Sequence, residues 1–73
     1  MSHEVIAELA ANVWKIVAKP GDQIGPDDTL VILESMKMEI PVSAEVSGTI
    51  TSFEVAEGAV IDEGAVIAIV EID

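Results

Sequence analysis

An internal repeat at a spacing of 37 residues constrains this chain more than any other feature of its sequence. Residues 5–36 align with residues 42–73 without a gap. The aligned pairs include identical residues at Val5/Val42, Ala7/Ala44, Glu8/Glu45, Gly21/Gly58, Ile24/Ile61, Ile32/Ile69 and Glu34/Glu71. Each half is too short to bury its own apolar face, so we expect two similar halves that share one hydrophobic core.

The repeat also decides between helix and strand for the first third of the chain. Residues 4–19 are rich in Ala and Glu and could form an amphipathic helix. Their counterpart, residues 42–55, contains several β-branched residues and a glycine, which is typical of strands. Because the halves share one fold, we predict strands in both.

The remaining apolar runs complete an all-β prediction. Residues 29–35 and 65–72 have the length of strands, and turn residues separate the segments at Pro20-Gly21, Gly25-Pro26-Asp27-Asp28, Gly58 and Gly64. We expect seven or eight short strands, with each half contributing one antiparallel sheet. The two sheets would pack as a small sandwich or flattened barrel with pseudo-twofold symmetry, a single domain over residues 1–73.

Net charge excludes several classes of partner. The 73 residues carry 14 Asp and Glu against three Lys and Arg, a formal charge of −11. A nucleic-acid-binding protein needs a basic face, and an anionic membrane would repel this chain.

Cysteine is absent, which rules out disulfides and thiolate metal sites. Since Met1-Ser2-His3-Glu4 lacks the basic start of a secretory signal, we expect a cytoplasmic protein.

The segment between the two repeats has unusual chemistry for a turn. Lys37 is the only cation after residue 20, and Met36 and Met38 flank it. Tight turns normally contain Gly, Asn, Asp or Ser. Methionines at an exposed turn suggest a soft surface that meets a partner or packs beneath a tethered group. The alternative is a solubilising surface lysine between methionines that fill gaps in the core.

The segment Glu34-Ser35-Met36-Lys37-Met38-Glu39 resembles the attachment motif of biotinyl domains, in which Met-Lys-Met follows a small residue. The resemblance covers nearly the whole chain and includes the paired halves with a central lysine. It points to the biotin/lipoyl attachment family, in particular to short biotin carboxyl carrier proteins. Related lipoyl domains usually carry Asp-Lys-Ala at this turn, so Met36 and Met38 favour biotin over lipoate as the cofactor.

This resemblance implies a carrier with no catalytic activity of its own. Lys37 would lie on an exposed hairpin turn, flanked by Met36 and Met38 as the recognition motif, and biotin protein ligase would join biotin to it through an amide. The attached biotin would then carry a carboxyl group from biotin carboxylase to a carboxyltransferase that acts on acetyl-CoA, as in fatty acid biosynthesis, or on another acyl-CoA. A lipoyl carrier for a 2-oxoacid dehydrogenase complex and an unmodified binding module of the same fold remain the alternatives.

Other polar residues offer weaker candidates for a site. Asp27-Asp28 and Asp62-Glu63 could suggest acid–base chemistry or a metal site. Both pairs fall in matching turns of the repeat, where acids stay solvated, so we assign them a structural role. His3 has no metal-binding partner nearby in the sequence and should be solvated. Ser35 has no obvious base, since His3 is the only histidine. We therefore expect no catalytic residue and no metal ligand.

Four residues carry structural expectations. Trp14 and Phe53 are interpreted as packed apolar residues and not as recognition platforms, and Trp14 aligns with the polar Thr51. Gly48 should permit a bend or a close approach of another backbone segment. Pro41 has no N–H to donate to a neighbouring strand, so its strand should lie at the edge of a sheet or be bulged there.

Overall fold

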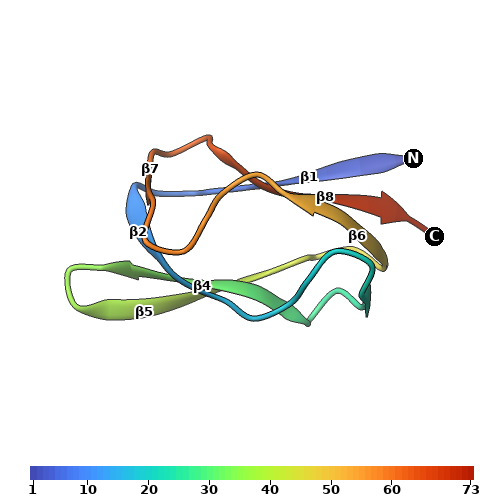
Figure 1. Ribbon diagram of the computed structural model, residues 1–73, viewed down its shortest axis with the longest axis horizontal. Coiled ribbons are helices and arrows are strands. Elements are labelled where there is room, and N and C mark those ends of the chain that lie inside the picture. The colour runs from blue at the N-terminus through green and yellow to red at the C-terminus, as the bar shows by residue number, and fades with distance from the viewer.

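Two four-stranded antiparallel sheets pack face to face in the computed structural model, which describes all 73 residues (Figure 1). The strands are β1 (Ser2–Ile6), β2 (Ala11–Ile16), β3 (Gln23–Ile24), β4 (Thr29–Ser35), β5 (Met38–Ser43), β6 (Gly48–Phe53), β7 (Val60–Ile61) and β8 (Val66–Ile72). The all-β prediction is confirmed, including strands and not a helix in residues 4–19.

Strands of the two halves match in position along the chain. The limits of β2, β3 and β4 differ from those of β6, β7 and β8 by 37 residues each. The β4 and β8 strands share one burial pattern along all seven residues. Their neighbours β2 and β6 both carry an irregularity in register at matching places, Val13/Lys15 and Ile50/Ser52. The halves are therefore equivalent down to the position of a bulge.

Strand order differs from our expectation of one sheet per half. One sheet has the order β1-β8-β6-β3 and the other β5-β4-β2-β7, so both contain strands of both halves. The physical reason is the short connection between β4 and β5, which makes these strands pair directly as a hairpin. The symmetry of the repeat then pairs β1 with β8 in the same way.

The core lies between the sheets and is entirely apolar. It contains fourteen buried hydrophobic residues and no buried polar or charged residue. The largest fully buried side chains are Leu30, Leu33, Ile50, Ile67, Val13, Val31 and Val70. Phe53 is half-buried against this cluster, which confirms its packed role.

Gly48 and Pro41 occupy the positions that their chemistry predicts. A Cβ added at Gly48 would lie 2.1 Å from the carbonyl oxygen of Glu71 on β8, so only glycine fits there without a shift of backbone. Pro41 lies on β5, an edge strand of its sheet, where the missing N–H leaves no ladder bond broken. Both expectations are confirmed.

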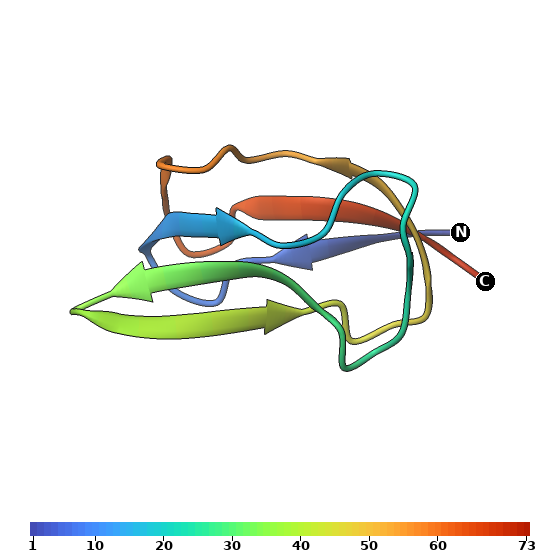
Figure 2. The same ribbon diagram turned by 60° about the horizontal axis from the view of Figure 1, so that its bottom comes forward.

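The molecule is elongated, with principal extents of 35 × 18 × 17 Å. The turn of the β4–β5 hairpin lies at one end of the long axis, and both chain termini lie at the other (Figures 1 and 2). The structure contains no helix with the length and hydrophobicity needed to cross a membrane. The fold thus separates the Met-Lys-Met segment from the termini by nearly the full length of the body.

Candidate functional site

A two-residue turn connects β4 to β5 and presents Lys37. Ser35 and Met38 form the last cross-strand pair, and Met36 and Lys37 form the turn with φ angles of 53° and 65°. Positive φ at both central residues is the pattern of a type I′ turn, which favours Asn-Gly. Left-handed backbone costs an ordinary residue roughly 1–2 kcal/mol. The prediction that Lys37 lies on a hairpin turn is confirmed, and its backbone is strained.

All three side chains of the Met-Lys-Met segment face solvent. Met36 is 90% exposed and Met38 is 63% exposed, and Lys37 is exposed between them. The alternative in which the methionines fill gaps in the core is therefore wrong. No carboxylate lies within 4 Å of the Lys37 amine, because the only ion pair of the structure joins Met1 to Glu71. An unpaired primary amine at an exposed tip fits a group that is attached through an amide.

The strands behind the turn hold it rigidly to the body. On β4, Val31 and Leu33 are fully buried, and on β5, Ile40 and Val42 pack against the same core. Lys37 itself contributes no contact to that core. A substitution at Lys37 should therefore change the chemistry of the tip without disturbing the scaffold that presents it.

Two acids flank the turn without a cationic partner. Glu34 on β4 and Glu39 on β5 stand directly opposite each other, and both are exposed. Like charges at directly opposed positions destabilise a sheet. No basic side chain forms an ion pair with either acid. The tip therefore offers a concentrated negative charge to any protein that approaches Lys37.

At the far end of the molecule, by contrast, an acid does have a cationic partner. There the N-terminal ammonium of Met1 lies 2.6 Å from Oε1 of Glu71, and Ser2 Oγ donates to Oε2 of the same carboxylate at 3.3 Å. The hydrogen bond and the charge of the ammonium hold the pKa of Glu71 below its usual range. The Gln23 amide also donates to Asp73 at 2.9 Å.

Trp14 does not occupy the packed position that we expected. It is 44% exposed at the irregularity of β2, and the Lys15 ammonium lies 5.7 Å from the centre of its ring. Alternation along β2 could have shown this, because buried Ala11 and Val13 direct Trp14 to the outer face. The polar Thr51 at the matching position of the repeat carried the same signal. The outer face of this sheet also exposes 78% of Val60.

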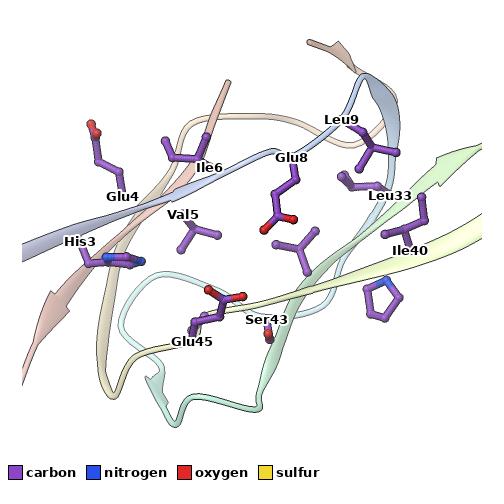
Figure 3. A pocket seen from close by; sticks show the side chains of 13 residues that line it. His3, Glu4, Val5, Ile6, Glu8, Leu9, Leu33, Ile40, Ser43 and Glu45 are labelled. Carbon is purple, nitrogen blue, oxygen red and sulfur yellow. The ribbon is translucent and has the colours of Figure 1, made fainter. Parts of the chain in front are cut away.

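A groove of about 410 Å³ runs between the edge strands β1 and β5 (Figure 3). Its lining mixes apolar residues with His3, Glu4, Glu8 and Glu45. His3 is half-buried in this wall and not fully solvated as we expected. Neither Lys37 nor its flanking methionines line the groove, so it is separate from the tip.

The paired acids lie in turns, as predicted. Asp28 accepts a hydrogen bond from the backbone N–H of Gly25 at 2.7 Å, which closes the turn before β4. Asp62 and Glu63 are exposed in the matching turn before β8. No group of three or more His, Asp and Glu side chains is placed to hold a metal ion. Ser35 forms the last cross-strand pair of the hairpin with Met38, whereas the single histidine, His3, lies on β1 of the other sheet.

Comparison with known families and relatives gives matches over nearly the whole chain. The model of the biotin/lipoyl family, described as "Biotin-requiring enzyme", matches residues 3–70. The Mycobacterium leprae protein named "Biotinylated protein TB7.3 homolog" is 50% identical over 70 residues, covering 96% of this chain and 99% of the relative. The "Biotin/lipoyl attachment protein" of Bacillus subtilis is 44% identical over 63 residues, 86% of either chain.

Solved structures agree with the fold. This chain superimposes on part of the Kluyveromyces lactis urea carboxylase with a TM-score of 0.92 and 28% identity, covering 97% of this chain and 6% of that enzyme. A lipoyl domain of the 2-oxoglutarate dehydrogenase complex of Azotobacter vinelandii matches with a TM-score of 0.73 and 26% identity, over 88% of this chain and 82% of that domain. The same flattened sandwich thus occurs in a urea carboxylase and in a lipoyl domain.

Proposed function

The chain belongs to the biotin/lipoyl attachment family, and on that premise we propose that Lys37 is the residue to which a biotin protein ligase joins biotin. The observation that carries this proposal is the exposed, unpaired amine of Lys37 at the tip of the β4–β5 hairpin, between Met36 and Met38. Relatives of similar length are named as biotinylated proteins. Members of the family are carriers, so this chain is a biotinylated carrier and not an enzyme.

The structure limits what this chain itself contributes to the attachment. The amide forms between Nζ of Lys37 and the activated carboxyl carbon of biotin, and the amine loses protons as the leaving group departs. No carboxylate of the chain lies close enough to take a proton from Nζ. The base and the activation therefore come from the ligase, and the chain supplies position. Acylation removes one positive charge, which changes the formal net charge from −11 to −12 (−11 − 1).

We propose further that the chain serves a biotin-dependent carboxylase. Biotin, when bound, supplies a ring nitrogen that takes up and releases a carboxyl group. The chain would then move between a biotin carboxylase and a carboxyltransferase, with acetyl-CoA or another acyl-CoA as acceptor, in the cytoplasm. The similarity to a domain of a urea carboxylase supports a role in carboxyl transfer. The two-residue turn leaves no protein segment over the tip, so an attached group would move freely between the two partner sites.

Mass spectrometry tests the attachment site directly. The unmodified chain is incubated with a purified biotin protein ligase, biotin and MgATP, and its intact mass and peptides are measured. We expect one added biotinyl group on Lys37. The Lys37→Arg variant should stay unmodified, while the matched control Lys19→Arg should gain the group. Both variants should unfold at the temperature of the wild type, since neither side chain is part of the core.

Four results would contradict the proposal. Modification of a residue other than Lys37 would misplace the site, and unfolding of Lys37→Arg would show that the lysine supports the core. An unmodified wild-type chain, with the ligase active on a control substrate, would leave a binding module of the same fold. A lipoyl group added in place of biotin by a lipoyl ligase would direct the search to 2-oxoacid dehydrogenase complexes.

A further inference from the structure

The two sheets have equivalent outer faces, which provides an internal comparison of surface chemistry. In the sheet that ends in the Lys37 turn, the outer face exposes Trp14 on β2, Pro41 on β5 and Val60 on β7. The register places Ile32 of β4 between the first two, opposite both Pro41 and Lys15. We call these four residues, Trp14, Ile32, Pro41 and Val60, the outer patch.

Three of the four equivalent positions of the other sheet are polar. At a spacing of 37 residues, Trp14 corresponds to Thr51, Pro41 to Glu4 and Val60 to Gln23, while Ile32 corresponds to Ile69. At each of the four positions, the two equivalent residues are either both exposed or both half-buried. Fold and burial are therefore matched at these positions, and neither explains why Trp14, Pro41 and Val60 are apolar where their equivalents are polar. Exposed apolar groups that gather on one face of a small protein mark an interaction surface.

The place of the outer patch indicates which partner covers it. Val60 pairs with Asn12, and Asn12 pairs with Glu34, which lies close to the β4–β5 turn. At about 3.3 Å per residue, Ile32 lies about 16 Å from Lys37 along β4. A typical interface buries about 800 Å² on each partner, which corresponds to a disc of about 16 Å radius. One ordinary interface beside the turn thus covers the outer patch.

The reach of each partner separates the candidates. An enzyme that acts on the lysine amine itself must come within the length of one lysine side chain of the backbone. Its surface must therefore contact the strand residues on either side of the turn. An enzyme that acts on the far end of an attached group can stay further away by the length of that group. We propose that the outer patch is the docking surface for the biotin protein ligase, with Trp14 as its main contact. This inference rests on the proposed function.

The chemistry of the patch defines the ligase surface that fits it. Trp is the residue most typical of interface hot spots, and Trp14 is already 44% exposed, with the Lys15 ammonium over its ring. Acids surround the apolar centre, with Glu34 and Glu39 toward the turn and Glu57 held against the end of β2 by the Ile16 N–H at 2.9 Å. The matching ligase surface is apolar at its centre and basic at its rim.

Steady-state kinetics of biotinylation test the proposal. The variant Trp14→Thr/Val60→Gln places on the outer patch the residues of the equivalent face. We expect its KM as the protein substrate of the ligase to rise ~10-fold, with kcat within about twofold of the wild-type value, because hot-spot contacts of this kind act through binding. The control variant Thr51→Ala/Gln23→Ala changes the equivalent face and should keep the wild-type KM. Val60→Gln alone, at a position 78% exposed and so safe for folding, should give a smaller rise in KM.

The outcomes separate this inference from the proposed function. An unchanged KM in Trp14→Thr/Val60→Gln, or an equal rise in the control variant, would overturn the docking surface while Lys37 is still biotinylated. A loss confined to kcat would also overturn it, because a docking surface acts on binding. Failure of the wild-type chain to accept biotin would instead contradict the proposed function. Thermal unfolding of each variant confirms that the comparison is made between folded proteins.

Discussion

The two ends of this molecule are built alike and differ in chemistry. At one end, β4 and β5 pair Glu34 with Glu39 and continue through the strained Met36-Lys37 turn. At the other end, β8 and β1 pair Glu71 with Ser2 in the same register, and the chain is open there. Glu71 binds the N-terminal ammonium at 2.6 Å, whereas Glu34 has no cation.

This difference shows which features the fold needs and which it only tolerates. The terminal end satisfies its charge, so its arrangement stabilises the body. The tip keeps a like-charged pair, two left-handed residues and two exposed methionines, each of which is unfavourable for stability. Features that cost stability at one end and are absent from the equivalent end are best explained by function.

The largest expected effect on stability comes from a substitution at Gly48, a position where the two equivalent sheets carry different residues. Gly48→Ala places a Cβ against the Glu71 carbonyl oxygen, and we expect it to lower the free energy of unfolding by about 3 kcal/mol. Its counterpart Ala11 already carries a Cβ, and Ala11→Gly should cost only about 1 kcal/mol. Urea unfolding followed by circular dichroism measures both. Equal losses in the two variants would show that β8 does not approach β6 closely.

A smaller effect sharpens the contrast between the ends by relaxing the turn. Lys37→Gly removes the left-handed penalty at one residue and should raise the free energy of unfolding by about 1 kcal/mol, while it abolishes biotinylation. Lys37→Ala keeps a Cβ and should lose biotinylation without the gain in stability. Urea unfolding of the two variants decides the point. A gain of the same size in Lys37→Ala would assign the effect to the lost charge and not to the backbone.

The smallest expected effect concerns the ion pair at the terminal end. Because the pKa of Glu71 is lowered in the folded state, its contribution is fully present above the ordinary pKa of a glutamate. That contribution is lost as the pH falls through the lowered pKa. Glu71→Gln should therefore remove a small part of the acid sensitivity seen in thermal unfolding. Identical pH profiles for Glu71→Gln and the wild type would argue against the ion pair.

Much of the fold could be predicted because the repeat doubles the signal of each strand. Residues 42–55 identified residues 4–19 as strands, and Pro41 indicated an edge strand, which β5 is. The motif around Lys37 predicted an exposed hairpin tip, which the structure confirms as geometry. The role of Lys37 in biotin attachment stays a prediction, which mass spectrometry of the ligase-treated chain tests.

Other features could not be predicted from single segments. Strand order depends on which strands a turn joins, so the exchange of β1 with β5 and of β3 with β7 between the sheets was not visible in the apolar pattern. Propensity opposes left-handed Met36 and Lys37, so no turn type followed from these residues. The exposed position of Trp14 follows from alternation along β2, in which Ala11 and Val13 are buried, and not from its apolar character.

The position of both termini at one end has a mechanical consequence. Any polypeptide joined to either terminus would hold the body at the end opposite the β4–β5 turn (Figure 2). The body would then act as a lever, and a rotation about the joined end would move the tip along an arc with a radius close to the full 35 Å length. Small changes of angle at a hinge would give large displacements of the lysine, without any bending of the sheets.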